Sequence, residues 1–392
     1  MPINKKNYLR ESVKKFEYEI EFLENLVTEY KINMNELIRL DIADPYIDTP
    51  LEIKYILLDA IYNKPDATHY TGIRGLPKFL ESVSKFYKEY YSINVNPYEN
   101  VLVTAGSSAG IYIVLSSLIE SNDEVIIPNP TFPNYSNIIK LLNGKPVFVP
   151  LTEDYHLDID IIRKNISERT KAIIICNPNN PTGTVYTQKE LEELMNLAKE
   201  YDLIIISDEV YSTLIYDNIP YISLAKLDKE LSNTIIINSL SKTFAMTGWR
   251  LGYVIANEEL IKNFEKLAFE IQGSVNTAVQ YAGAYANENW KILYYPIRTV
   301  FAKLRDFTVR RLREIGIRFI TPQAGFEMFP FLPEGFNDSI EFTKYLLAKA
   351  NVLVKPGIFF GPNGDKNFRI VFCRSQEELE NAFNRIEKII KN

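Results

Sequence analysis

Histidine and cysteine are scarce in this sequence, since its 392 residues contain only two of each. The histidines, His69 and His156, stand far apart and far from either cysteine, so the chain shows no spacing typical of metal ligands. A zinc site or a Ser-His-Asp triad would depend on one of these two residues. We therefore expect no metal, and we expect lysine, tyrosine or a carboxylate to carry any acid–base chemistry.

Long apolar runs and clusters of positive charge are also missing. No run approaches the roughly 18 residues that a membrane span needs, and the first residues, MPINKKNYLRESVKKFEYE, lack the apolar region of a secretory signal. The net charge is −6, without the groups of lysine and arginine that nucleic acids require. These features argue against membrane and nucleic-acid partners and favour a cytoplasmic protein. The two cysteines, Cys176 and Cys373, leave a disulfide open, although free thiols are the default in that compartment.

Short apolar runs alternate with helical patterns from about residue 100 onward. The runs are VLVTAG, EVIIPN, PVFVP, KAIIICN, LIIISDE, TIIINS and GYVIAN. Continuous valine and isoleucine runs separated by helices are typical of a mostly parallel sheet with helices on both faces. The sequence therefore predicts an α/β fold, with a large domain over residues 46–290 built on a seven-stranded sheet. We expect residues 291–392 to form a smaller α+β domain, which residues 1–45 complete with an amphipathic helix over 13–30.

Polar residues follow the ends of five of these runs. They are Gly106-Ser107-Ser108, Asn129-Pro130, Asn177 to Gly183, Asp208-Glu209, and Ser239 to Lys242. In an open α/β sheet, ligands bind beyond the carboxyl ends of the strands. We therefore expect one binding site along this edge.

Two of these motifs indicate how a ligand could be held. The motif TAGSSAG (104–110) can hold a phosphate at a helix N-terminus, although a serine that merely caps the helix is the simpler interpretation. The motif NPNNPTG (177–183) is more specific, because it places two X-Pro bonds directly after a buried strand. A cis peptide bond at Pro181 would aim Asn180 into the cleft, whereas the alternative is a rigid loop that binds nothing.

Asp208 and Lys242 are the charged residues that most need an explanation. Asp208 follows four apolar residues, so it either pairs with a cation or caps a helix. At ~3 Å from a protonated ring nitrogen, an effective dielectric constant of ~20 gives an attraction of about 5 kcal/mol. Lys242 ends a strand beside the cation Arg250, and desolvation would favour its neutral amine, which forms a Schiff base with an aldehyde. Arg250 would then hold a phosphate; the alternative is a pair of solvated loop cations.

The segment SLSKTFAMTGWRLGY, together with NPNNPTG and DEVY, resembles the pyridoxal-phosphate-dependent aminotransferases of class I/II, the aspartate aminotransferase-like enzymes of fold type I. The resemblance covers nearly the whole chain, from LDIADPYIDTP to FRIVF. It implies pyridoxal 5'-phosphate as the cofactor and a reaction in two half-reactions, which moves the amino group of an L-α-amino acid to a 2-oxo acid. It also implies a homodimer with a shared active site.

The resemblance implies a role for each matching residue. Lys242 matches the lysine that bonds to the cofactor and moves a proton, and Asp208 matches the carboxylate that pairs with the pyridine nitrogen. Tyr211 matches the tyrosine that donates to the phenolate oxygen of the ring. Asn180 is similar to the asparagine that contacts this oxygen and the substrate carboxylate, and Phe132 matches the aromatic ring that stacks on the pyridine.

The remaining matches concern the phosphate and the substrate. The positions implied for binding the cofactor at its phosphate are Gly106, Ser107, Ser108, Ser239 and Arg250, with Tyr70 reaching across from the partner subunit. Arg369 in FRIVF needs an anion, and its bidentate geometry suits the substrate α-carboxylate that the family binds there.

Three positions bear on the substrate. Ala43 stands near this carboxylate, where glycine is usual. Glu327 replaces a common tyrosine and is expected to point to solvent; facing the cleft, it would disfavour acidic substrates. Ser108 stands where some relatives that prefer acidic substrates have a lysine, so nothing supports aspartate as the substrate.

Other activities on this scaffold are alternatives. A lyase that carries out β- or γ-elimination, or an amino-acid cyclase, would use the same lysine, aspartate and arginine, because a fold does not determine a reaction. The motifs NPNNPTGTVY and DEVY are more similar to those of transaminases. A transcription regulator with an aminotransferase-like domain is a remote alternative, because the residues before LDIADP are too few for a helix-turn-helix unit.

Overall fold

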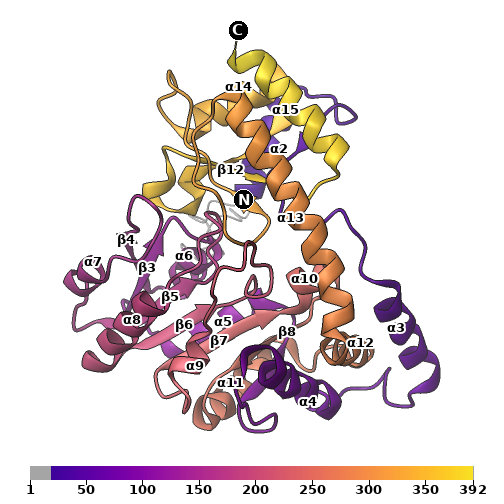
Figure 1. Cartoon of the computed structure of the whole chain (residues 1–392). Coiled ribbons are helices and arrows are strands. Elements are labelled where there is room, and N and C mark those ends of the chain that lie inside the picture. The colour runs from indigo at the N-terminus through magenta and orange to yellow at the C-terminus, as the bar shows by residue number, and fades with distance from the viewer. Residues whose placement is uncertain (1–18, 392) are drawn as a thin grey trace, which may run out of the picture.

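A seven-stranded sheet forms the centre of the computed structural model, which describes residues 19–391 (Figure 1). The strand order is β2-β8-β7-β6-β5-β3-β4. In chain order the strands are β2 (Val101–Thr104), β3 (Glu124–Asn129), β4 (Lys145–Pro150), β5 (Thr170–Cys176), β6 (Ile204–Asp208), β7 (Thr234–Ser239) and β8 (Gly252–Ile255). β8 is antiparallel to β2 and β7, and the other neighbouring pairs are parallel. Each of the seven apolar runs forms a strand, so the predicted α/β fold is confirmed.

Alternating side chains of each strand pack on opposite faces of this sheet. In β5, Ile173 and Ile175 join one hydrophobic core, and Ala172 and Ile174 join another. The first core includes α4 (Pro77–Phe86), α8 (Gln188–Glu200), α9 (Leu224–Leu227) and α12 (Thr277–Glu288), and the second includes α5 (Ser107–Leu118), α6 (Asn134–Leu141) and α11 (Glu258–Gln272). Helices therefore cover both faces, which explains why the strands are apolar throughout.

Further helices complete this part of the molecule. They are α3 (Leu51–Asn63), α7 (Ile159–Lys164), α10 (Leu240–Thr243), the π-helix η2 (Tyr87–Tyr91) and the 3-10 helix η3 (Thr247–Trp249). Among them, α3 packs on α12 and lies at the periphery of the molecule (Figure 1).

The 26-residue helix α13 (Trp290–Ile315) leads from the sheet to the C-terminal elements (Figure 1). These are α14 (Ser339–Ala350), α15 (Gln376–Ile390), η4 (Gly357–Phe360), η5 (Pro362–Gly364) and a sheet of β11 (Lys355–Pro356), β12 (Phe368–Val371) and β9 (Glu327–Met328).

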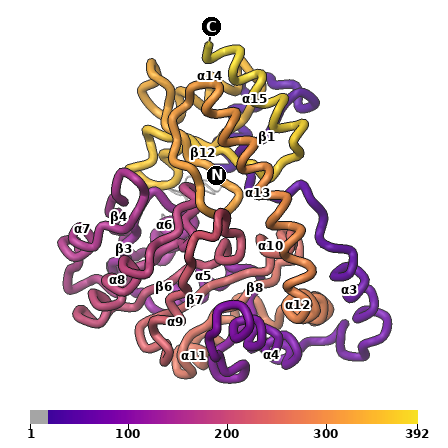
Figure 2. Tube along the Cα trace, in the orientation of Figure 1, coloured from indigo at the N-terminus to yellow at the C-terminus, as the bar shows by residue number. Residues whose placement is uncertain are grey.

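The described N-terminal segment joins these C-terminal elements. Its strand β1 (Ile38–Arg39) pairs in parallel with β10 (Val352–Leu353), and Figure 2 shows the indigo and yellow ends of the chain together. Helix α2 (Glu19–Glu29) covers the later part of the helix expected over 13–30, and residues 13–18 lie outside the described residues. The domain boundaries at 45 and 290 stay a prediction.

Two other expectations concern the cysteines and the membrane. Cys176 and Cys373 are both free and buried, so the default of free thiols is confirmed. No helix among residues 19–391 combines the length and the apolar character needed to cross a bilayer.

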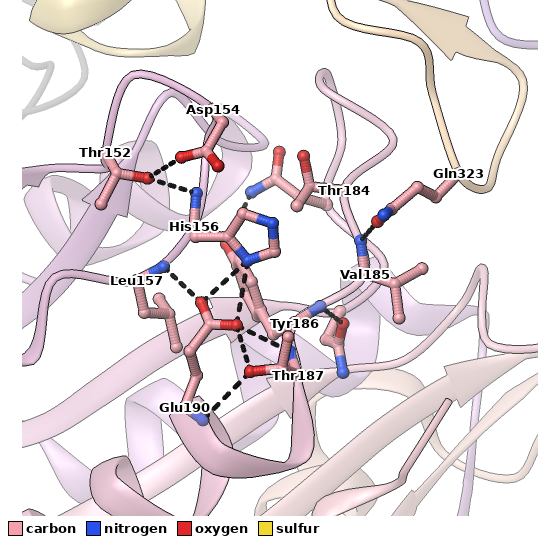
Figure 3. A network of polar contacts seen from close by, with 12 residues as sticks. Thr152, Asp154, His156, Leu157, Thr184, Val185, Tyr186, Thr187, Glu190 and Gln323 are labelled. Atoms are coloured by element: carbon pink, nitrogen blue, oxygen red, sulfur yellow. Dashed lines mark hydrogen bonds and ion pairs between the residues drawn. The ribbon is translucent and has the colours of Figure 1, made fainter. Parts of the chain in front are cut away.

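A polar network fixes the segment that follows the NPNNPTG motif (Figure 3). Glu190 forms a capping box with Thr187 at the start of α8, and it also accepts hydrogen bonds from Leu157 N at 2.7 Å and from His156 Nδ1 at 2.9 Å. Gln323 Oε1 accepts a hydrogen bond from Val185 N at 2.7 Å. The network thus joins this segment to two other loops.

We predict that replacing His156 with alanine destabilises the protein more at pH 6 than at pH 9. The hydrogen bond to Glu190 raises the pKa of His156. Although burial opposes it, hydrogen bonds from His156 and Thr187 lower the pKa of Glu190. The ion pair therefore contributes fully below the ordinary histidine pKa of about 6.5 and is lost as pH rises through the raised value. Urea unfolding at the two pH values should show a difference of about 0.5–1 kcal/mol; an equal destabilisation at both would contradict this.

Candidate active site

A cleft of about 680 Å³ lies between the carboxyl edge of the large sheet and the C-terminal elements. The expected site residues that line it are Ala43, Ser107, Ser108, Phe132, Asn180, Asp208, Tyr211, Lys242, Arg250 and Arg369. Three others, Gly106, Ser239 and Tyr70, do not line it. Five separate strand ends and two segments from outside the sheet therefore converge on one cavity.

Lys242 lies on α10, directly after β7, and its amine is enclosed by protein although part of the side chain is exposed to the cleft. Its Nζ donates a hydrogen bond to the Ala43 carbonyl at 2.6 Å. Burial lowers the pKa of Lys242, and the positive charge of Arg369 lowers it further, whereas Glu327 opposes the shift. We expected Arg250 to be the neighbouring cation; Arg369, which comes from β12, has this effect instead. A lysine with a lowered pKa supplies the neutral amine that attacks an aldehyde.

Asp208 ends β6 and is 3% exposed. Its Oδ2 accepts a hydrogen bond from the Tyr135 hydroxyl at 2.7 Å, and its Oδ1 accepts one from Val210 N at 3.3 Å. Burial raises the pKa of Asp208 to about 6, and these hydrogen bonds and Lys242 oppose the shift. Among residues 19–391, no lysine, arginine or histidine forms an ion pair with it, so the cleft contains a buried carboxylate that suits a cationic ligand.

Tyr135 was missed by the sequence analysis. It stands at the start of α6, three residues after Phe132 in the motif PNPTFPNY, and the two rings contact edge to face with centroids 5.6 Å apart. The motif was visible, but nothing in it indicates that the hydroxyl reaches Asp208, which is 73 residues away in the chain.

The start of α5 and Arg250 form a place for an anion. The N-cap of α5 is Gly106 rather than a serine, and no side chain caps the helix, so the first N–H groups at Ser107 and Ser108 are available to a ligand. Gly106 has a φ of +83°, and a Cβ there would lie 2.4 Å from Arg250 Nη2. The guanidinium of Arg250 donates to the Thr247 carbonyl at 2.9 Å, and no carboxylate pairs with it in the described part of the chain.

Ser239 and Tyr70 lie elsewhere than the other expected residues. Ser239 is buried and caps α10, with its Oγ accepting from Ser241 N at 3.1 Å, and it is Ser241 that lines the cleft. Tyr70 is 95% exposed on the surface.

Arg369 and Asn180 meet at the substrate end of the cleft. Arg369 is 3% exposed, and its Nη1 lies 3.5 Å from Asn180 Oδ1. Its Nε is buried and has no hydrogen-bond partner within residues 19–391, so a guanidinium donor is left for an incoming carboxylate. The Asn180–Pro181 bond is cis, as predicted from the sequence.

Lys355 is a second residue that the sequence analysis missed. It lies directly opposite Arg369 in the antiparallel pair of β11 and β12 and lines the same cleft. Its Nζ forms an ion pair with Glu19 Oε1 at 2.9 Å. The register of these two short strands decides its position, and the sequence carried no signal for that register.

The expectation that Glu327 points to solvent is wrong. The side chain is fully buried, its Oε1 accepts a hydrogen bond from the Tyr211 hydroxyl at 2.5 Å, and its Oε2 accepts one from Phe326 N at 2.8 Å. A Cβ on Gly325 would lie 2.8 Å from Oε2, so the glycine leaves room for the carboxylate. Burial raises the pKa of Tyr211, and the charge of Glu327 adds to this effect.

The groups in this cleft fit one kind of ligand. An amine with a lowered pKa suits an aldehyde, a buried carboxylate without a cation suits a basic ring nitrogen, and an uncapped helix start beside an arginine suits a phosphate. Pyridoxal phosphate carries all three groups. The fold and the cleft therefore define an α/β enzyme that uses this cofactor.

Comparisons with known proteins agree with this conclusion. The chain belongs to the family described as aminotransferase class I and II, whose model matches residues 35–386. It is 37% identical over 363 residues to an aspartate aminotransferase of Pyrococcus abyssi, covering 91% of this chain and 92% of that protein. It is 36% identical to aromatic-amino-acid aminotransferase 2 of Thermococcus litoralis, with coverage of 91% and 92%. The structure of an alanine aminotransferase from Pyrococcus furiosus is similar with a TM-score of 0.92 at 33% identity, covering 98% of this chain and 99% of that one.

The chain is thus a pyridoxal-phosphate-dependent aminotransferase, which moves the amino group of an L-α-amino acid to a 2-oxo acid. The names of the three relatives differ in their amino acid: aspartate, aromatic amino acids and alanine.

We predict that, without cofactor, the Asp208→Asn variant gains stability relative to the wild-type protein as the pH rises from 4 to 8. The folded pKa of Asp208 is about 6. An unfolded aspartate has a pKa near 3.9, so the free energy of unfolding falls as pH rises between these values. Asparagine removes this loss, which is worth about 1–3 kcal/mol. Guanidinium unfolding of the cofactor-free proteins at both pH values is the measurement.

Added pyridoxal phosphate serves as the control for this comparison. It should stabilise the wild-type protein more than Asp208→Asn, because only the carboxylate pairs with the ring nitrogen. A stability difference that is the same at pH 4 and pH 8 would show that Asp208 is not held at a raised pKa.

Proposed function

We propose that Lys242, Asp208 and Tyr211 carry the reaction in this cleft, with Lys242 as the residue that bonds to the cofactor. The observation that most supports this is the lowered pKa of Lys242 in the same cleft as Asp208, a buried carboxylate that forms no ion pair with a lysine, arginine or histidine among residues 19–391. When bound, pyridoxal phosphate supplies the electron sink for the negative charge that develops at the substrate α-carbon.

Each residue then has a separate task. Asp208 keeps a proton on the ring nitrogen, and the Tyr135 hydroxyl holds Asp208 in position. Arg369 binds the substrate α-carboxylate with the help of Asn180, next to Ala43. With substrate bound, Nζ of Lys242 would act as the base that takes the proton from the substrate α-carbon and as the acid that gives the proton back.

Further residues hold the cofactor in place. Phe132 would hold the ring from one face, and Tyr211 and Asn180 would lie near its phenolate oxygen. The phosphate would be held at Ser107, Ser108 and Arg250, with Gly106 as the N-cap of α5 and Ser239 as the cap of α10 supporting this end of the cleft from behind its lining; the uncapped start of α5 and the lack of a carboxylate at Arg250 in the described chain support this assignment.

We propose that the enzyme is a homodimer that shares its active sites through Tyr70. Helix α3 exposes an apolar face whose residues recur at helical spacing, with Leu51 62% exposed, Tyr55 65% and Tyr62 84%. A surface of this kind is typical of a contact with another protein, and in a two-fold dimer each subunit offers the same face. Tyr70 follows this helix and is itself almost fully exposed. We also propose a cytoplasmic location, and domains over 1–45 with 291–392 and over 46–290.

Replacing Lys242 with alanine should abolish the visible absorption of the purified enzyme and lower the transamination rate by about 10³-fold or more. The reason is that Lys355, the other lysine that lines the cleft among the described residues, is held in an ion pair with Glu19. The measurement is a half-reaction screen in which amino acids are mixed with the enzyme and the released products are identified. The wild-type enzyme should release a 2-oxo acid and keep the amino group. Release of ammonia instead would favour a lyase, and a Lys242→Ala variant with full activity would end the proposal.

Mixing the Tyr70→Phe and Lys242→Ala variants should restore wild-type cofactor binding at one site of the mixed dimer if Tyr70 acts across the dimer. Tyr70→Phe should weaken pyridoxal phosphate binding by about tenfold or more, the value of one hydrogen bond to a charged group. A mixed dimer has one Tyr70→Phe subunit and one Lys242→Ala subunit. One of its two sites then combines the intact Lys242 of the first subunit with the intact Tyr70 of the second. Titration of refolded mixtures should then show a class of sites with wild-type affinity. If Tyr70 acts within its own subunit, no such class appears.

A further inference from the structure

The hydroxyl of Tyr211 already has a strong acceptor within the protein. It donates to Glu327 Oε1 at 2.5 Å, and both side chains are almost completely buried. A phenol has a single proton to donate. While this proton forms the hydrogen bond to Glu327, Tyr211 does not donate it to an oxygen of the cofactor. The amide of Asn180 then remains as the donor to that oxygen.

Glu327 is also held rigidly in place. Its second oxygen, Oε2, accepts a hydrogen bond from Phe326 N at 2.8 Å. Gly325, which has a φ of +81°, leaves space for this oxygen because it has no Cβ. The side chain is not part of the cleft lining, so it acts on a ligand only through other residues. Because Glu327 stands on β9 next to β12, its place behind Tyr211 follows from the pairing of these strands.

The carboxylate lies close to the amine that bonds to the cofactor. Lys242 Nζ is 5.8 Å from the centroid of the Tyr211 ring and 5.7 Å from that of Phe326, the residue before Glu327. The ionisable groups that act on Lys242 come from several elements: Glu327 on β9, Arg369 on β12, Cys373 after it and Asp44 on the N-terminal segment. Among them Glu327 has the largest effect in favour of the charged amine.

We propose that Glu327 is a positioning residue that accepts the hydrogen bond of the Tyr211 hydroxyl and thereby keeps the Lys242 nitrogen protonated to a higher pH in the enzyme with bound cofactor. This inference rests on the proposed role of Lys242, and it assigns the proton of Tyr211 to a hydrogen bond with Glu327 instead of one with the cofactor. Two effects act in the same direction. The negative charge of Glu327 favours a proton on nitrogen, and the loss of a donor at the anionic cofactor oxygen strengthens the attraction between that oxygen and the protonated nitrogen.

The test is an absorbance titration of the reconstituted enzyme and its Glu327 variants between pH 5 and pH 10. In Glu327→Gln the visible band should titrate with an apparent pKa lower by about one unit or more, because a single charge several ångströms away changes proton affinity by at least about tenfold. Glu327→Tyr, which introduces the residue common in the family, should shift it in the same direction. Glu327→Asp keeps the charge and should restore most of the wild-type value.

Two controls separate this role from a loss of stability. Glu190→Gln also removes a half-buried, hydrogen-bonded carboxylate, but one outside the cleft, and should leave the apparent pKa unchanged. The second control uses Tyr211→Phe as the starting enzyme. Adding Glu327→Gln to this variant should lower the apparent pKa by less than Glu327→Gln does in the wild-type enzyme, because only the charge effect remains.

The outcomes distinguish this inference from the proposed function. An apparent pKa that stays within 0.3 units (about twofold in proton affinity) in both Glu327→Gln and Glu327→Tyr would overturn the role of Glu327 while leaving the role of Lys242 intact. A wild-type protein that gains no visible band with pyridoxal phosphate, or a band that persists in Lys242→Ala, would instead overturn the proposed function.

Discussion

Removal of charged groups from water is the constraint on which this active site depends. Burial makes the ammonium form of Lys242 unfavourable and makes the carboxylate form of Asp208 unfavourable, so the protein shifts the two pKa values toward each other. Both groups are therefore more reactive toward a suitable ligand than they would be in water. A cofactor that offers an aldehyde to the amine and a protonated nitrogen to the carboxylate satisfies both, which explains why this cleft suits pyridoxal phosphate.

The sheet places these two groups together by its topology. Asp208 ends β6 and Lys242 follows β7, and the two strands are parallel neighbours in which Asp208 lies opposite Ile237. The uncapped start of α5 comes from β2 at the same edge. Parallel strands point their carboxyl ends to one edge, so residues from distant parts of the chain meet without any long loop.

The C-terminal elements supply the charges that adjust this site. Arg369 lies on β12 and Glu327 on β9, and they act on Lys242 in opposite directions. Arg369 is suited to an incoming carboxylate, which would offset its charge when the substrate binds. Glu327 has no such exchangeable partner, since it is bound to Tyr211 and to the backbone. Lys355 is a further cation at the substrate end of the cleft, and the carboxylate of Glu19 pairs with it. The balance of charge at Lys242 thus depends on elements that flank the large sheet.

The sequence by itself determined the strands of the large sheet and the edge at which the cleft lies, and it predicted residues that line this cleft, among them Asn180, Asp208 and Lys242. These follow from local patterns: apolar runs form buried strands, and polar motifs such as NPNNPTG mark where they end. Only the tertiary structure decided that Tyr135 supports Asp208, that Arg369 rather than Arg250 acts on Lys242, and that Glu327 is buried against Tyr211. These contacts join segments 73 to 127 residues apart, as Tyr135 with Asp208 and Lys242 with Arg369 illustrate. They depend on the register of short strands and on space left by single glycines, which the alternation of apolar and polar residues does not encode.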